Sequence, residues 1–154
     1  MLIERQHRSQ RINERPMSEI VTNEFLADSH LHRLADVRLG LLRLHKALLE
    51  MERIDYEKVF GRVTAGELLQ LVINHAQFGW LRIISALVVE IDEALNGDEL
   101  ATSSDFEALI SQARLLLTSP ADEEFKTKYQ AALQREPSVV MAHSTVMQLL
   151  RKDK

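Results

Sequence analysis

The feature that most constrains this chain is an apolar seam between residues 34 and 51. Alternating steps of three and four residues separate Leu34, Val37, Leu41, Leu44, Leu48 and Met51. This spacing keeps the apolar side chains on one face of an α-helix, as in coiled coils and helical bundles. The seam therefore predicts a long helix that begins after an N-cap at Asp28 or Ser29 and ends at about Arg53–Ile54.

A second long helix is expected from Thr64 to about Leu95. Thr64 and Glu67 have the spacing of a capping box, and Asn96–Gly97 is expected to stop the helix in the left-handed conformation. An unusually wide arc of this helix is apolar, formed by Leu69, Val72, Ile73, Ala76, Trp80, Ile83, Ile84, Leu87, Val88 and Ile91. Such a helix lies either at the centre of a bundle or in an oligomer interface, and the sequence leaves both open for residues 68–91.

Three further helices are expected after residue 100. Ser104 and Glu107 have the spacing of another capping box. Ser119–Pro120 is expected to start the next helix, with Ser as the N-cap and Pro at the first helical position. Pro137 disfavours helix at the preceding residue, so it predicts a break before a last helix that ends near Arg151.

The connections between these helices are short, which favours antiparallel neighbours. We therefore expect an all-α fold: an up-and-down four-helix bundle with an extra short N-terminal helix from Met17 to about Asp28 and a split C-terminal helical region. No segment shows the alternation of a strand. Residues 17–154 are expected to form one domain, and residues 1–16 a flexible basic arm.

The composition excludes several kinds of chemistry. The 154 residues contain no Cys, which excludes disulfides, thiol catalysis and Cys-ligated metals. The net charge of −4 gives no reason to expect nucleic-acid binding. The most apolar stretch, residues 78–91, is shorter than the about 20 residues that a bilayer requires and contains Arg82 and Glu90. Without a secretory signal at the N-terminus, the expected location is the cytoplasm.

Three histidines are the candidate metal ligands. His45, His75 and His143 fall on three different predicted helices. His143 lies on an apolar face, His45 flanks the apolar seam, and His75 flanks the polar stripe of the second helix. Their convergence in one cavity would create a divalent-metal site of the kind that bundles build from facing helices. For His143 the alternative is a buried imidazole that is hydrogen-bonded to a carbonyl or carboxylate. A His-x-x-x-His pair is absent, so a zincin-type site is not expected.

Part of the chain resembles the first half of the DinB/YfiT-like helical bundles. The resemblance covers residues 34–95 and consists of a Leu-rich first helix, a looser connection, and a Thr-x-x-Glu-Leu-Leu helix start at Thr64. His75 and Trp80 follow in the same helix. It implies a bundle fold and a divalent-metal-dependent enzyme.

In that family a histidine of the second helix and a later His-x-x-x-His pair hold the metal. Leu71 stands at the position expected for the first histidine, and His75 follows one turn later. Of the later pair only His143 is present, with Val139 and Met147 at the four-residue spacings. The resemblance therefore carries over only His75 and His143 as ligands.

Three hypotheses about function follow. The first is a non-enzymatic interaction or dimerisation module, a homodimer through the second long helix, with a protein partner as a further option. The second is the DinB-like enzyme with a divalent metal. The third is a small-ligand pocket inside the bundle, lined by Trp80 and Phe78 and lying beside His143. No catalytic residue is assigned, and no cofactor apart from the metal of the second hypothesis.

Overall fold

The computed structural model describes residues 17–97, 99 and 101–151, and the side chains from residue 28 onward. The predicted arm, residues 1–16, lies outside the described residues. The elements in chain order are α1 (Met17–Phe60), α2 (Ala65–Asn74), the 3₁₀-helix η1 (Ala76–Leu81), α3 (Arg82–Asn96), α4 (Ser103–Thr118), α5 (Glu123–Arg135) and α6 (Pro137–Leu150). The all-α class is confirmed, and the described residues include no strand.

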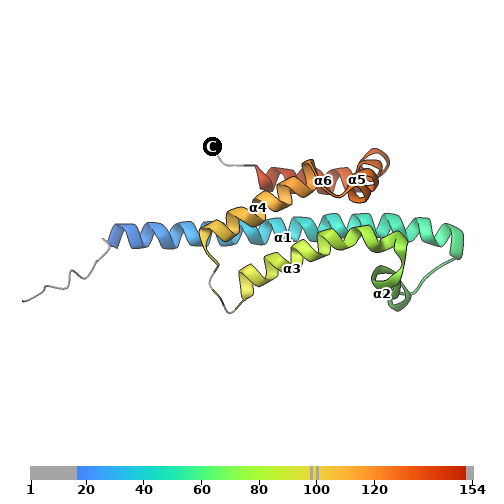
Figure 1. Cartoon of the computed structure of the whole chain (residues 1–154), viewed down its shortest axis with the longest axis horizontal. Helices are drawn as coiled ribbons and strands as arrows, with labels where there is room; N and C mark the ends of the chain where they lie inside the picture. The colour runs from blue at the N-terminus through green and yellow to red at the C-terminus, as the bar shows by residue number, and fades with distance from the viewer. Residues whose placement is uncertain (1–16, 98, 100, 152–154) are drawn as a thin grey trace, which may run out of the picture.

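The long helix α1 is the element around which the others pack. Figure 1 shows α3 along one side of α1, and α4 and α6 along the other. In addition, α4 contacts both α3 and α6, and α5 contacts α6 and η1. The predicted seam of α1 faces these neighbours: Leu34, Val37, Leu41, Leu44 and Leu48 are fully buried and Met51 is buried. The seam prediction is therefore confirmed.

The two helices α1 and α6 approach closely at Gly40. A Cβ atom at this position would lie 2.9 Å from Cγ2 of Val146 and 3.4 Å from Cδ1 of Leu149. Glycine lets the two helices come closer than a larger residue would. At the end of the same contact, the guanidinium of Arg33 donates to the carbonyl oxygens of Leu149 and Leu150, which lack partners within α6.

The predicted ends of the first long helix are wrong. The helix does not break at Asp28–Ser29, so the extra N-terminal helix is part of α1, and it runs past residues 53–54 to Phe60. Asp28 and Ser29 favour caps, but no proline or glycine near them interrupts the helix, and tertiary context overrides such weak preferences. The helix ends where Gly61 takes a positive φ of 87°, the conformation that glycine adopts without strain.

The predicted second long helix is not continuous. It breaks at His75 into α2 and the η1–α3 unit, and the two parts are bent by 79°. The expected cap at Thr64 is present, since its hydroxyl accepts from the Glu67 amide at 3.2 Å. Gly97 ends α3 with φ −71° rather than in the left-handed region. A Cβ atom there would lie 2.4 Å from the Glu93 carbonyl oxygen, so the close turn excludes a side chain.

Two other predicted helix starts are displaced. The capping box before α4 is formed by Thr102 and Asp105, two residues before the predicted Ser104–Glu107 pair. Asp122, not Ser119, caps α5, and its carboxylate accepts from the Phe125 amide at 2.8 Å. The break at Pro137 is confirmed, with proline in the first turn of α6.

Within the described residues, no single helix has the length and apolar character needed to cross a membrane. The α2 and η1–α3 segments reach that length and composition together, but only as a pair that is sharply bent at His75.

Candidate interaction surface

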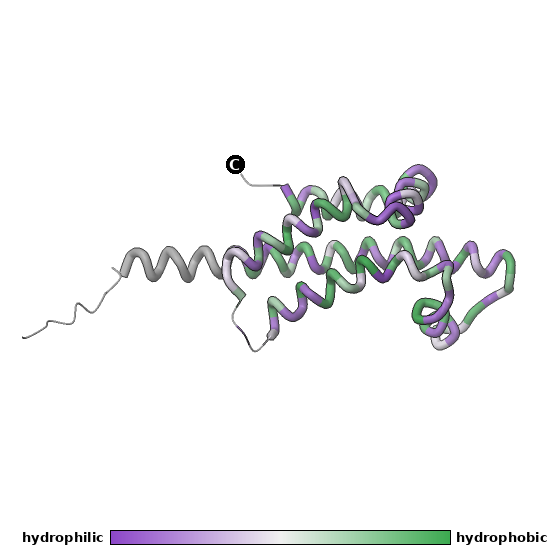
Figure 2. Tube along the Cα trace, viewed as in Figure 1, coloured by the Kyte–Doolittle hydropathy of each residue, from purple (hydrophilic) through white to green (hydrophobic). Residues whose placement is uncertain are grey.

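Helix α2 is apolar but buries none of its residues. Half of its ten residues are Leu, Val or Ile. Leu69 and Ile73, one turn apart on the same face, are 58% and 52% exposed. Figure 2 shows α2 with strongly hydrophobic segments at the margin of the fold, below the end of α1. An apolar helix in this position leaves its free face without an internal partner.

One polar contact links the C-terminal end of α2 to α3. The guanidinium of Arg82, the first residue of α3, donates to the Ile73 carbonyl oxygen at the C-terminal end of α2. On the polar face, Asn74 donates to Gln70 at 3.2 Å, and both side chains are exposed. The main packing contact of α2 is with η1. The apolar face of α2 therefore lies at the edge of the fold rather than in its core.

The end of α1 adds more exposed apolar side chains. Val59 is 74% exposed and Phe60 is 65% exposed. The connection to α2 is ordered by Glu57, which accepts from the Val63 amide at 3.0 Å and pairs with Arg53. We call the exposed apolar residues in the last two turns of α1 and on α2 the tip surface: Ile54, Val59, Phe60, Leu69 and Ile73.

His75 is the residue at which the chain turns from α2 into η1. Its backbone is extended, and its Nδ1 atom accepts from the Gln77 amide at 3.1 Å, so the imidazole is the N-cap of η1. The ring packs edge-on against Tyr56 at 5.5 Å between centroids and lies near Phe78. The sequence placed His75 inside a helix, and the structure gives it a capping role instead.

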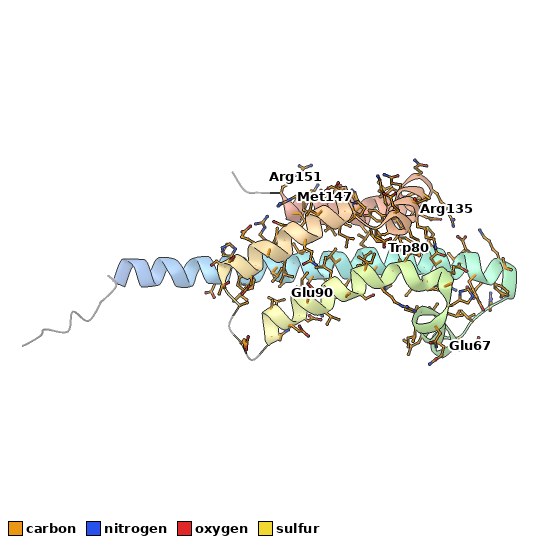
Figure 3. All side chains as sticks on the ribbon, viewed as in Figure 1. Glu67, Trp80, Glu90, Arg135, Met147 and Arg151 are labelled. Carbon is orange, nitrogen blue, oxygen red and sulfur yellow. The ribbon has the colours of Figure 1, made fainter. Side chains whose placement is uncertain are left out.

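Phe78 and Trp80, the predicted pocket residues, are packed in the interior. Both are buried, and Nε1 of Trp80 donates to Glu52 of α1 at 3.2 Å. Gln77 donates to the same carboxylate at 2.8 Å and to the Glu52 carbonyl oxygen at 3.1 Å. Figure 3 labels Trp80 where η1 meets α1. These contacts fix the position of η1 and therefore of the break at His75.

The other two candidate ligands have separate partners. His45 of α1 lies 3.2 Å from the Ser85 hydroxyl of α3, and His143 of α6 lies 2.5 Å from the Tyr129 hydroxyl of α5. Burial lowers the pKa of both imidazoles and raises the pKa of the Tyr129 phenol. The partner of His143 is thus a phenol rather than the expected carbonyl or carboxylate.

The three histidines do not come together in the described part of the chain. Each belongs to a different contact: His45 to the α1–α3 contact, His75 to the start of η1, and His143 to the α5–α6 contact. Among residues 28–151, apart from 98 and 100, no group of three or more His, Asp or Glu side chains is placed to hold a metal ion. The geometry offers the three predicted ligands no shared cavity.

Folding stability should fall on acidification because of His45 and His143. Their pKa values in the folded protein lie below the ordinary value of 6.5, so the unfolded chain binds these protons more tightly. The contribution is therefore fully present above pH 6.5 and is lost as the pH falls below it. Urea unfolding at a series of pH values measures this dependence. It should be weaker in a His45→Gln/His143→Gln variant; an equal dependence in both proteins would show that other groups cause it.

Sequence reasoning missed the part of the tip surface that lies on α1. Val59 and Phe60 fall after the predicted end of the helix and outside its heptad seam, in a segment that we read as a connection. The available signal was Gly61, which follows these two residues and is the helix stop that the structure shows.

Comparison of the chain with protein-family models, with curated proteins and with solved structures gave no match. The resemblance to the DinB/YfiT-like bundles and the divalent metal that it implies therefore stay predictions.

Proposed function

We propose that this protein is a non-enzymatic, homodimeric interaction module whose contact surface is the part of the tip surface that lies on α2. The observation that carries the proposal is that α2, half of which is Leu, Val or Ile, buries no residue. Large exposed apolar patches typically mark sites of protein association, and the exposed Leu69 and Ile73 lie on one face of this helix. The proposal keeps the predicted homodimer. It places the contact on α2, which is the first part of the helix that the sequence predicts as the dimer interface.

A second copy of the chain suits this surface because the surface is self-complementary. Two α2 helices related by a twofold axis would pack antiparallel, Leu69 and Ile73 of one copy against the same residues of the other. The apolar stripe carries no charge that the contact would have to desolvate. The pairing would also bring Glu67, at the start of α2, close to Arg82, beyond the end of the other copy's α2. Antiparallel helix dipoles favour the same arrangement.

The proposal includes two predictions about context. The first is the up-and-down four-helix arrangement of α1, α3, α4 and α6, which is supported by their mutual contacts. The helices α2 and η1 would then be an insertion between the first two members of the bundle, and α5 an insertion between the last two. The second is a cytoplasmic location.

The test is the mass of the protein in solution for variants with charges on α2. A Leu69→Glu/Ile73→Glu variant should be a monomer of 17.7 kDa, while the unmodified chain should have twice that mass by light scattering and sedimentation. Gln70→Glu/Asn74→Glu is the matched control, since it adds the same two charges to the polar face of the same helix. It should leave the dimer intact, because neither side chain lies on the apolar stripe.

Circular dichroism distinguishes loss of the dimer from loss of the fold. The helical content of both variants should equal that of the unmodified chain, because all four substituted side chains are exposed. A monomeric unmodified chain at every protein concentration would overturn the proposal. So would a control variant that dissociates as readily as the Leu69→Glu/Ile73→Glu variant.

A further inference from the structure

A groove between α3 and α4 lies apart from the tip surface. Its volume is about 440 Å³, and the segment 119–122, which links α4 to α5, closes one side. Ile83 and Leu87 of α3 and Leu115 and Leu116 of α4 form its apolar walls. Leu115 is 59% exposed although it lines this concave surface. The volume lies within the range of about 300–1,000 Å³ that is typical of small-molecule sites.

The charged groups at this groove are all negative. The side chains that line it include the carboxylates of Glu90 on α3 and Asp122 before α5, and no Lys or Arg. Both acidic residues are exposed at the rim, and Figure 3 labels Glu90 on α3. The Asp122 carboxylate also accepts a hydrogen bond from the Phe125 amide. Among the described contacts, Glu90 therefore has fewer hydrogen bonds than Asp122 and is the freer of the two to pair with a ligand.

The end of α4 adds to this negative potential. Leu115 and Leu116 belong to the last turn of α4, where the helix dipole is negative and backbone carbonyl groups lack helical partners. No basic residue lies in that last turn. The nearest preceding arginine, Arg114, donates to the Leu150 carbonyl oxygen of α6 instead. A cation on the groove would therefore meet two carboxylates and a helix C-terminus without a competing positive side chain among the lining residues.

We infer that this groove binds an amphipathic organic cation: a primary amine or a guanidinium attached to an apolar body. The apolar body lies against Ile83, Leu87 and Leu115, and the cationic group lies at the rim beside Glu90. This site goes beyond the proposed dimer, since it uses none of the residues of the tip surface. A failure of either proposal therefore leaves the other unaffected.

A matched set of three probes tests the inference. 2-Naphthylmethylamine, 2-naphthylmethanol and 2-naphthoate share a two-ring body and carry a positive, a neutral and a negative polar group. Calorimetric titration should rank the amine first, by about two- to fivefold in Kd over the alcohol, as expected for exposed ion pairs. The preference should shrink at high salt because the charges are screened. Methyl NMR signals of Ile83, Leu87 and Leu115 should shift on addition of the amine.

Two charge variants and one blocking variant locate the cationic group. Glu90→Gln should remove most of the preference for the amine over the alcohol. Glu93→Gln is the matched control, because Glu93 is exposed one turn away, is not among the groove-lining residues, and its replacement changes the net charge equally. Ala86→Trp, at an exposed groove position, should weaken binding of all the probes. Equal affinities for amine and alcohol, or equal effects of Glu90→Gln and Glu93→Gln, would overturn the inference.

Discussion

Replacing Leu44 with Ala is expected to lower the free energy of unfolding by about 2–5 kcal/mol. Leu44 lies in the middle of the α1 seam and is fully buried. The substitution removes apolar contacts and leaves a cavity that the helices packed around α1 fill only in part. The seam lies at the contacts of α1 with α3, α4 and α6, so the loss affects the whole fold rather than one element.

The measurement is urea unfolding at one fixed protein concentration, since association contributes to apparent stability. Leu42→Ala is the matched control: it removes the same atoms two residues away, where the side chain is 36% exposed. It should cost less than about 1 kcal/mol. Equal costs for the two variants would show that the assignment of the buried face of α1 is wrong.

The seam was predictable because the spacing of residues within one segment of the chain determines it. Apolar residues at alternating steps of three and four define one helix face wherever that helix lies, and all six of them are buried. Pro137 was predictable for the same reason, because it disfavours helix at the residue before it. For Thr102 and Ser104 the local signal is ambiguous, since each has an acidic residue three positions later, and only Thr102 is the cap.

The break at His75 was not predictable because its causes are distant in sequence. The helical periodicity continues through residue 75, and no proline or glycine marks the break at that position. In the structure the helix is interrupted, and Gln77 and Trp80 after the break donate hydrogen bonds to Glu52. Glu52 lies more than 20 residues earlier in the chain. Tertiary contacts of this kind override local helix preference.

The break also explains why the apolar arc allowed two interpretations. Its second part, on α3, belongs to the hydrophobic core, with Ile84 and Ile91 fully buried. Its first part, on α2, keeps Leu69 and Ile73 exposed. The core interpretation is therefore confirmed for the residues after His75, while the oligomer interface stays a prediction for the residues before it. The sequence does not mark where the buried part of the arc begins.

Whether the candidate histidines meet in one site was not predictable from the sequence either. The sequence places each imidazole on a particular face of its helix, but whether the three faces meet in one cavity depends on the rotation of each helix about its axis. That rotation is set by packing, as at Gly40, where α1 meets Val146 of α6. His45 and His143 consequently meet a serine and a tyrosine instead of each other.

Replacing Phe125 with Ala should cost about 3–5 kcal/mol, the largest effect that we expect from a single substitution. Phe125 is fully buried on α5, and its ring centroid lies 5.6 Å from that of Trp80 and 5.2 Å from that of Tyr129. It joins α5 to η1, and the Tyr129 hydroxyl beside it is paired with His143 of α6. Losing the ring removes apolar contacts and aromatic pairing at one position.

The fluorescence of Trp80, the only tryptophan, reports this change directly. Its emission should shift to the red in Phe125→Ala as water reaches the indole, and urea unfolding should give the free energy. Phe125→Leu is the control, since it keeps the site apolar and fills most of the volume, and it should cost clearly less.

Amide hydrogen exchange tests which elements the substitution loosens. Because Glu52 anchors Trp80 and Gln77, the exchange rates in Phe125→Ala should rise more in η1 and α5 than in the α1 seam. Uniform exchange across all helices would show that these elements are not a separable unit.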